Sequence, residues 1–222
     1  MPKVFLDYGH GGNDPGAISG SYKEKDITLA IGKRVKYHLE RHNFSIVESR
    51  EGDTNPSLIE RSNKANANNV DIAVSIHCNS FSDVSAKGTE IYTYGQGTRE
   101  IGLAKAILNQ VIKDGLYSVN RGIKQANFHM TREIKTASVL FETAFISNTE
   151  DRNILINKQE QLAISIAKGI LNFYDMQYKN DSQNNTSSDK LYRVQVGAFK
   201  VKANAEKLAN ELKSKGYSTY IV

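Results

Sequence analysis

The chain has 222 residues and a formal net charge of +5, with 39% hydrophobic and 24% charged residues, which is enough for one full hydrophobic core and a small appendage. No uninterrupted apolar run approaches the roughly 20 residues that a transmembrane helix needs, so no transmembrane helix is expected. The single cysteine, Cys78, excludes an internal disulfide and is expected to be a small buried hydrophobe.

Short apolar runs alternate with amphipathic helices through the first 176 residues. Met1 leads directly into the first run, without the charged and apolar regions of a secretory signal, so we expect no signal peptide. The runs predict strands at Lys3 to Tyr8, Phe44 to Glu48, Asp71 to His77, Gly88 to Tyr94 and Ser138 to Glu142. Helical spacing is shown by Ile27, Ile31, Val35 and Leu39, by Ala104, Ile107, Leu108 and Val111, and by Leu162, Ile166, Ile170 and Phe173. This alternation predicts an α/β domain with a mostly parallel, twisted sheet between helical layers.

Residues 177–189, QYKNDSQNNTSSD, are expected to form a flexible linker. The segment has so few apolar side chains that their burial could not compensate for the conformational entropy lost on folding. The tail, residues 190–222, reads as one small β-α-β unit, too small to bury an adequate core alone. It contains seven basic and two acidic residues, so it accounts for the whole charge of +5 and residues 1–189 sum to zero. No nucleic-acid motif accompanies this charge, and an anionic polymer or a merely solvated basic surface explains it equally well.

Three residues suited to metal or acid–base chemistry follow predicted strands. His10 follows the first strand in DYGHGG, His77 ends DIAVSIH and Glu142 ends VLFE. Because the carboxyl ends of parallel strands converge on one crevice, these side chains can meet there. Glu24, just before the first amphipathic helix, would face the same edge. Two imidazoles and a carboxylate are a familiar catalytic zinc set with a fourth position left for water, although the spacing matches no short metal-binding motif.

Each candidate also has an ordinary structural interpretation. A histidine after a strand is often only a hydrogen-bonded turn residue, and Glu24 is a carboxylate that a helix N-terminus favours. Glu142 lies among apolar residues, so it needs a partner such as a metal-bound water. His129, in ANFHMTRE, is a competing ligand candidate, whereas His38 and His42 are expected to have a surface role. The glycine-rich DYGHGGNDPG lacks the Lys and Ser/Thr of a phosphate-binding loop, so tight turns beside a metal ligand explain it better.

Six segments in order closely resemble the zinc-dependent N-acetylmuramoyl-L-alanine amidases of the amidase_3 type, over roughly residues 2–175: DYGHGGNDPGA, KEKDITLAI, ERSNKAN, DIAVSIHCNS, NRGIKQANFHMTRE and VLFETAFISN. The segment LYRVQVGAFKVKANAEKLANELKSKGY resembles the first half of a SPOR domain, a wall-binding module that recognises glycan strands. The combination is similar to the lytic amidases of spore-forming bacilli and their phages. It implies a catalytic domain over residues 1–176, the linker 177–189 and a partial SPOR-like segment over 190–222.

The resemblance implies hydrolysis of the amide bond between N-acetylmuramic acid and L-alanine in bacterial peptidoglycan. One zinc ion would polarise the scissile carbonyl and lower the pKa of its water, and the catalytic carboxylate would pass the proton to the leaving nitrogen. The zinc ligands implied are His10, Glu24 and His77, the catalytic carboxylate is Glu142, and the substrate contacts are Asn79 and Arg121.

The resemblance also implies partners and a place of action. Peptidoglycan is the expected partner, with stem peptides in the active site and glycan strands at the tail; nucleic acid and membrane are not expected, and the chain is expected to be a monomer. Without a signal peptide, we expect synthesis in the cytoplasm and action on the wall after lysis or release. Two alternatives remain: a zinc peptidase that cuts within the stem peptide, and a non-catalytic wall-binding or activator protein, against which the intact candidate set argues.

Overall fold

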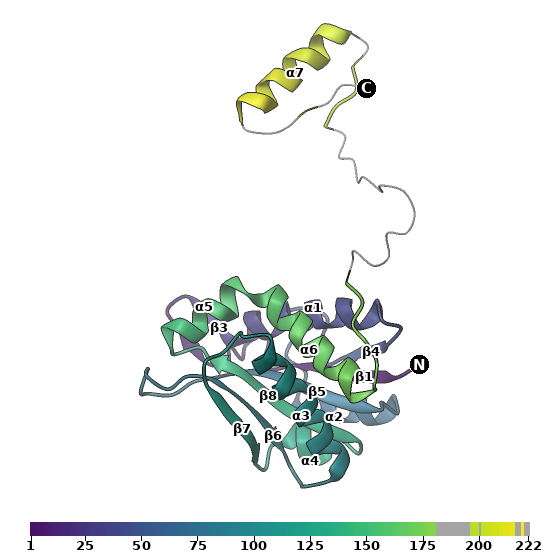
Figure 1. The fold of residues 1–222 in the computed structure, drawn as a ribbon, viewed down its shortest axis with the longest axis vertical. Helices are drawn as coiled ribbons and strands as arrows, with labels where there is room; N and C mark the ends of the chain where they lie inside the picture. The colour runs from purple at the N-terminus through teal and green to yellow at the C-terminus, as the bar shows by residue number, and fades with distance from the viewer. Residues whose placement is uncertain (181–195, 200, 216–218, 220–222) are drawn as a thin grey trace. The chain divides into compact units, whose positions relative to one another are not determined.

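The computed structural model describes residues 1–180, 196–199, 201–215 and 219, drawn as a ribbon in Figure 1. The chain falls into two units, Met1–Lys179 and Asn180–Val222. None of the helices in the described part of the chain is long and apolar enough to cross a membrane. All six residues predicted to form the active site lie in the first unit.

A six-stranded sheet runs through the first unit (Figure 1). In spatial order its strands are β4 (Ser45–Glu48), β1 (Lys3–Tyr8), β5 (Ile72–Asn79), β8 (Ala137–Phe145), β6 (Thr89–Thr93) and β7 (Asn120–Gln125). The first four are parallel, whereas β6 runs antiparallel to β8, and β7 runs parallel to β6. The mostly parallel α/β fold is therefore confirmed. The sequence did not predict β7, and β5 and β8 continue beyond His77 and Glu142.

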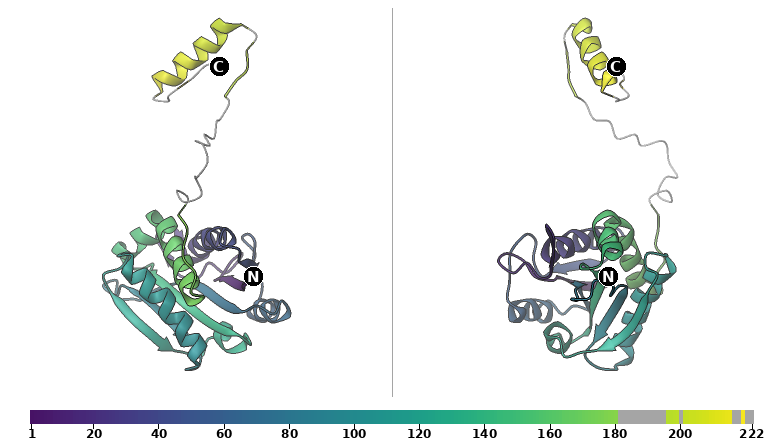
Figure 2. Two further views of the ribbon diagram at one scale, coloured as in Figure 1. Left: turned by 45° about the vertical axis from the view of Figure 1, so that its right-hand side comes forward. Right: turned by 90° about the vertical axis from the view of Figure 1, so that its left-hand side faces the viewer.

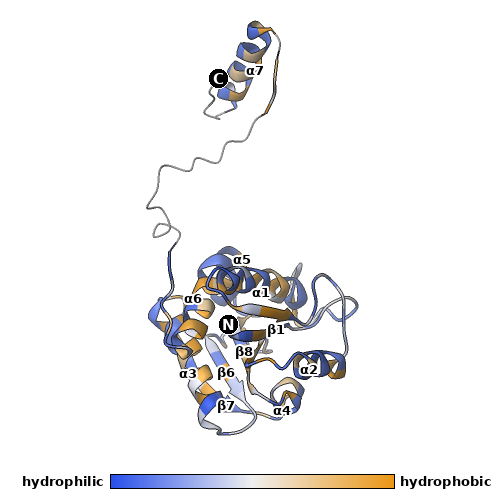
Figure 3. Cartoon of the chain, turned by 90° about the vertical axis from the view of Figure 1, so that its right-hand side faces the viewer, coloured by the Kyte–Doolittle hydropathy of each residue, from blue (hydrophilic) through white to orange (hydrophobic). Residues whose placement is uncertain are grey.

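Helices cover both faces of this sheet (Figures 2 and 3). One face carries α1 (Glu24–Glu40), α3 (Thr98–Lys113) and α6 (Gln159–Phe173), which include the three predicted helical segments. The opposite face carries α2 (Leu58–Ala67) and α4 (His129–Glu133). A two-stranded hairpin of β2 (Ile18–Ser19) and β3 (Tyr22–Lys23) leads into α1, and α5 (Thr149–Asn157) leads into α6.

Alternate side chains of β1 enter two separate apolar cores, because successive side chains of a strand point to opposite faces. Val4, Leu6 and Tyr8 belong to the larger core beneath α1, α3 and α6, whereas Phe5 packs with Ala65 of α2 in the smaller one. Burial of each large apolar side chain contributes about 1.5–3 kcal/mol. Because helices cover both faces of the sheet, polar side chains of the strands can reach solvent mainly at the strand ends.

His38 and His42 are buried, so the expected surface role is wrong for both. Nε2 of His38 lies 2.8 Å from Oε1 of Glu160 on α6, and its Nδ1 lies 2.8 Å from the hydroxyl of Tyr178. The backbone N–H of Lys179 donates to Nε2 of His42 over 2.8 Å. The sequence could not reveal these contacts, because the partners lie more than a hundred positions further along the chain.

The same contacts set the end of the first unit. Tyr178 and Lys179, which composition assigned to the linker, contact His38 of α1 and His42 just beyond it, and the unit ends at Lys179 instead of Met176. Residues 181–189 of the expected linker lie outside the described residues.

The second unit contains the predicted helix, α7 (Lys202–Ser214). None of its residues is buried, and two i,i+4 ion pairs, Lys202–Glu206 and Glu211–Lys215, lie along its surface. Of the two predicted flanking strands, residues 192–195, 217–218 and 220–222 lie outside the described residues, and residues 196–199 have no regular structure.

The contacts of residues 177–179 lead to a test with two truncated chains. A chain cut after Asn180 keeps them, whereas one cut after Met176 loses two hydrogen bonds, each worth about 1 kcal/mol net, and the packing of Tyr178. We expect the shorter chain to lose roughly 1–3 kcal/mol in free energy of unfolding, measured by urea titration in the same metal buffer. Since both chains lack the tail, equal unfolding midpoints would show that residues 177–179 do not stabilise the domain.

Candidate metal centre

Three side chains from separate parts of the chain converge at the carboxyl edge of β1 and β5. His10 follows β1, Glu24 begins α1 and His77 lies near the end of β5. Nε2 of His10 is 3.1 Å from Oε2 of Glu24, and Nδ1 of His77 is 3.0 Å from Oε1 of Glu24. One potential ligand atom from each residue lies within 4.8 Å of the others. The structure thus brings together the three residues predicted to bind metal.

The carboxylate of Glu24 is buried and strongly stabilised in its charged form. Oε1 accepts the backbone N–H of Cys78 and Oε2 that of Ala17, both over 2.9 Å. Burial alone would raise the pKa of Glu24, but the hydrogen bonds with His10 and His77 outweigh it and hold this pKa well below its usual range. Burial likewise opposes protonation of the two imidazoles, yet Glu24, together with Asp14, raises the pKa of His10 to about 9, and Glu24 raises the pKa of His77. The cluster is therefore built to hold positive charge.

Backbone shape makes room for this cluster. His10 itself has a φ of 63°, in the left-handed region, and Gly16 has a φ of 64°. A Cβ at Gly9 would lie 2.4 Å from Cε1 of His77, and one at Gly16 would lie 2.6 Å from Oε2 of Glu24. These approaches are closer than any side chain permits, so the glycines serve the tight packing that the sequence suggested.

Two buried arginines hold the loop that carries His10. Nε of Arg50 and Nη1 of Arg61 donate to the carbonyl of Tyr8 over 3.0 and 2.8 Å. Nη2 of Arg50 donates to the carbonyl of Gly9 over 3.3 Å, and Nη2 of Arg61 donates to that of His10 over 2.8 Å. Sequence reasoning missed both residues. Arg61 lies in the segment ERSNKAN. Only the fold shows that Arg61, from α2, and Arg50 together bind the carbonyls of three consecutive residues, 8–10.

Glu142 lies in register with this cluster on β8. Its strand partners are His77 on β5 and Glu90 on β6. Oε2 of Glu142 is enclosed and has no hydrogen-bond partner in the described part of the chain. Burial raises the pKa of Glu142 to about 7, against the attraction of His77, and the carboxylates of Glu24 and Glu90 act in the same direction as burial. A carboxyl group with such a pKa can both accept and donate a proton near neutral pH.

Asn79 and Arg121, the predicted substrate contacts, meet at the buried carboxylate of Glu90. Nδ2 of Asn79 donates to Oε1 of Glu90 over 2.7 Å, and its Oδ1 accepts the backbone N–H of Ser80 over 2.8 Å. Nε of Arg121 donates to Oε2 of Glu90 over 2.7 Å. Asn79 therefore already has internal partners for both side-chain polar atoms, and its substrate contact stays a prediction. Glu90 is a second residue that sequence reasoning missed.

His129 and Cys78 lie outside the candidate metal-binding group. His129, the competing ligand, begins α4, where its Nε2 lies 3.1 Å from Oγ of Ser62. Cys78 is a free, buried thiol, as predicted from the sequence. Burial raises the pKa of this thiol, which disfavours the thiolate that a metal would need.

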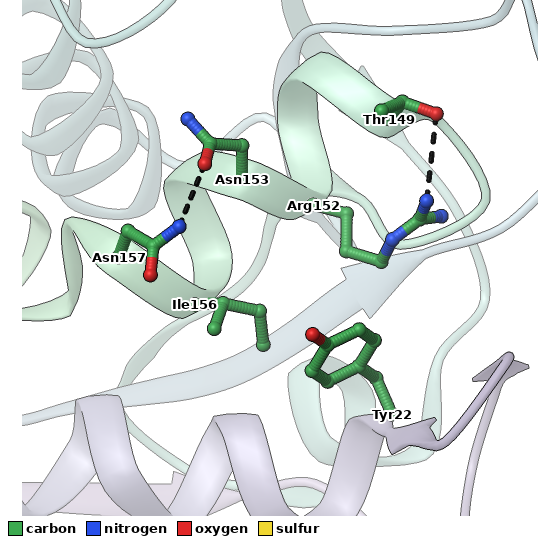
Figure 4. Close-up of a pocket in the computed structure, with 6 residues that line it drawn as sticks. All are labelled: Tyr22, Thr149, Arg152, Asn153, Ile156 and Asn157. Atoms are coloured by element: carbon green, nitrogen blue, oxygen red, sulfur yellow. Dashed lines mark hydrogen bonds between the residues drawn. The ribbon is translucent and has the colours of Figure 1, made fainter.

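A pocket of about 270 Å³ lies between the β2–β3 hairpin and α5 (Figure 4). Nδ2 of Asn157 donates to Oδ1 of Asn153 there, over 2.7 Å. None of the predicted site residues lines it, so this pocket does not mark the metal centre. Its lining residues are Tyr22, Thr149, Arg152, Asn153, Ile156 and Asn157.

The donor set of the cluster fits a catalytic zinc ion. Two imidazole nitrogens and one carboxylate are a common three-ligand set that leaves a coordination position open. Oδ2 of Asp14 lies 2.8 Å from Nδ1 of His10, so the far ring nitrogen of that imidazole has the carboxylate partner that usually orients a metal-binding histidine. His10, Glu24 and His77 would hold the ion, and their assignment as ligands stays a prediction.

A mostly parallel α/β sheet that carries this donor cluster beside the buried carboxylate of Glu142 has the features of a hydrolase with a candidate metal centre. Residues 4–172 match the family model of N-acetylmuramoyl-L-alanine amidases, and residues 188–222 match that of the SPOR domain. The chain therefore belongs to the N-acetylmuramoyl-L-alanine amidase family, with a C-terminal SPOR domain.

Individual relatives agree with this assignment. The chain is 36% identical over 224 residues to the sporulation-specific N-acetylmuramoyl-L-alanine amidase of Bacillus subtilis, covering 100% of this chain and 85% of that protein. Among solved structures, the amidase AmiC2 of Nostoc punctiforme is 35% identical with a TM-score of 0.74, covering 78% of this chain and 97% of its own. The catalytic domain of CwlV from Bacillus (Paenibacillus) polymyxa is 31% identical with a TM-score of 0.74, covering 80% and 100%.

The geometry of the centre predicts different results for two histidine variants. His77→Ala removes one of three ligands, so bound zinc should fall from near one per chain to well below that. His129→Ala is the matched control and should keep its zinc. Elemental analysis after dialysis against buffered zinc measures the content, and thermal unfolding should show that zinc stabilises only the control, since a ligand favours the folded state that binds it. Full zinc content in His77→Ala, or loss of it in His129→Ala, would refute the assignment.

Proposed function

We propose that the chain hydrolyses the amide bond between N-acetylmuramic acid and L-alanine in peptidoglycan, with one zinc ion held by His10, Glu24 and His77 and with Glu142 as the catalytic carboxylate. The observation that carries the proposal is the position of Glu142. Its enclosed Oε2 has no partner in the described residues, and it lies in register with His77. A buried polar atom without a partner is costly, and such atoms are typical of catalytic sites.

Zinc in this centre would supply Lewis-acid polarisation of the scissile carbonyl and a water of lowered pKa. Two neutral imidazoles and one carboxylate leave the bound ion with a net positive charge. Asp14 orients the ring of His10. Arg50 and Arg61 hold the backbone of the same loop through the carbonyls of Tyr8 and His10. The donor geometry is thus set before the substrate arrives, which limits the reorganisation needed during the reaction.

In this proposal, Glu142 moves the proton that hydrolysis requires. The reaction forms a bond between a water oxygen and the carbonyl carbon, and it breaks the bond from that carbon to the L-alanine nitrogen. Oε2 of Glu142 accepts the proton of the attacking water and then donates it to the departing nitrogen. A pKa of about 7, raised mainly by burial, suits both transfers. The products are a carboxyl group on N-acetylmuramic acid and a free amino terminus on L-alanine.

The tail adds attraction to the cell wall. Residues 188–222 match the SPOR domain, and residues 190–222 carry the whole net charge of the chain. Exposed charges attract an anionic polymer at low ionic strength and are screened by salt. The contribution of the tail to wall binding should therefore be largest at low salt and small at high salt.

Glu142→Gln tests the catalytic role separately from metal binding. The amide keeps the shape of the side chain but cannot accept a proton, so turnover of a soluble muropeptide should fall by roughly 10²-fold to 10⁴-fold. Zinc content, measured on the same preparation, should stay near one per chain. Loss of the zinc would make Glu142 a ligand, and full activity would remove it from the mechanism.

Analysis of new chain ends tests the reaction itself. Purified peptidoglycan is digested by the intact chain with and without a chelator, and the new termini are identified by labelling and mass spectrometry. We expect new L-alanine amino termini, no new reducing sugars and no cleavage in the chelator. New amino termini within the stem peptide would instead identify a wall peptidase, and the absence of cleavage in buffered zinc would support the non-catalytic alternative.

A further inference from the structure

A row of charged side chains continues from the metal centre across the sheet. His77 on β5 and Glu142 on β8 are register partners, and so are Glu142 and Glu90 on β6. Arg121, on the neighbouring strand β7, then contacts Glu90. Register partners on adjacent strands lie on the same face of a sheet. The row therefore leads directly from the proposed catalytic carboxylate to an arginine.

Glu90 anchors this end of the row. Its carboxylate is buried and receives hydrogen bonds from Nδ2 of Asn79 at 2.7 Å, the hydroxyl of Tyr92 at 2.8 Å, Nε of Arg121 at 2.7 Å and Nζ of Lys124. Burial would raise the pKa of Glu90, but its cationic partners outweigh burial and lower it. Glu90 is thus a permanent negative charge, and it has more cationic partners than neutrality requires.

The surplus charge lies on Arg121. Only Nε of this guanidinium has a hydrogen-bond partner in the described part of the chain, so Nη1 and Nη2 are open. The group also lies over the ring of Phe145, with Cζ 4.9 Å from the ring centroid, and its side chain is 34% exposed. Glu90 and Phe145 together fix the plane of the guanidinium. A fixed, planar pair of N–H donors that reaches solvent is the arrangement that binds a carboxylate through two parallel hydrogen bonds.

We propose that Arg121 binds a carboxylate of the stem peptide and makes the enzyme prefer stems in which that group is free over stems in which it is amidated. The proposal rests on the proposed amidase function. Adjacent strands are about 4.8 Å apart, so the backbone of Arg121 lies two strand spacings, roughly 10 Å, from that of Glu142. The guanidinium reaches back from β7 over Phe145 of β8, so this spacing is an upper limit for the reach of the substrate. An extended peptide spans about 3.3–3.6 Å per residue. The carboxylate therefore belongs to one of the two residues that follow L-alanine.

A purely structural role for Arg121 makes a different prediction. If the arginine only neutralises Glu90, its loss disturbs the site for every substrate alike. Lys124 remains beside Glu90 in that variant, so the carboxylate keeps one cation. Recognition of a substrate carboxylate, in contrast, affects only the substrate that carries the free acid. The difference between two matched substrates is therefore the decisive readout.

The experiment uses two soluble muramyl tripeptides that differ only in the carboxylates of their second and third residues, which are either free or amidated. The intact zinc-loaded chain is compared with Arg121→Ala and Arg121→Lys. We expect Arg121→Ala to lose roughly 10-fold to 100-fold in kcat/KM for the free acid, mainly through KM, the scale of a lost charge-assisted hydrogen-bond pair. Its kcat/KM for the amide should stay within about threefold of the unaltered chain. Arg121→Lys should fall between the two, because it keeps the charge but not the pair of donors.

Arg34→Ala is the matched control for the loss of one positive charge. Arg34 lies on the surface of α1, 3.5 Å from Glu160, outside the row. The Arg34→Ala variant should cleave both substrates with the same kcat/KM as the unaltered chain. This control separates recognition by Arg121 from a general effect of the net charge of the protein. Equal losses for both substrates in Arg121→Ala, or no preference for the free acid in the unaltered chain, would overturn the proposal. If the unaltered chain cleaves neither tripeptide but zinc still binds, the proposed amidase function fails instead.

Discussion

Burial of the Glu24 carboxylate is the constraint on which the site depends. A charge removed from water must be compensated by hydrogen bonds and opposite charge. The backbone N–H groups of Ala17 and Cys78 supply the hydrogen bonds, while His10 and His77 face the same two oxygens. The hairpin before α1, the loop after β1 and the end of β5 are therefore tied to one carboxylate. This arrangement would also serve a cation held between the same three side chains.

Buried charge recurs around the centre, each time with a structural consequence. Asp7 and Arg61 form a buried ion pair at 2.8 Å, and Arg61 uses its other donors to fix the loop of His10. Glu90 similarly fixes the plane of Arg121. Buried ion pairs are often weak contributors to stability, yet loss of one partner is costly. We interpret their presence here as a means of positioning His10 and Arg121, the groups proposed to bind metal and substrate.

The sequence predicted the fold class, and it predicted that His10, Glu24 and His77 would meet at one edge of the sheet, because the carboxyl ends of parallel strands converge. Their role as metal ligands stays a prediction. The sequence could not predict that β6 runs antiparallel, since apolar alternation carries no strand direction. Arg50, Arg61 and Glu90 were also missed, because charged residues look alike in a sequence whether they are buried or exposed. His38 was misplaced for the same reason: its partner Glu160 lies 122 positions away. Long-range pairing, which periodicity cannot show, accounts for these differences.

The most direct measurement is the zinc-edge X-ray absorption spectrum of the chain loaded with one equivalent of zinc. Two histidines and a carboxylate predict scattering from two imidazole rings and a first shell of nitrogen and oxygen at about 2.0–2.2 Å, without sulfur. A sulfur neighbour at about 2.3 Å would place Cys78 on the metal. That result, or a spectrum with fewer than two imidazoles, would contradict the centre built around Glu24.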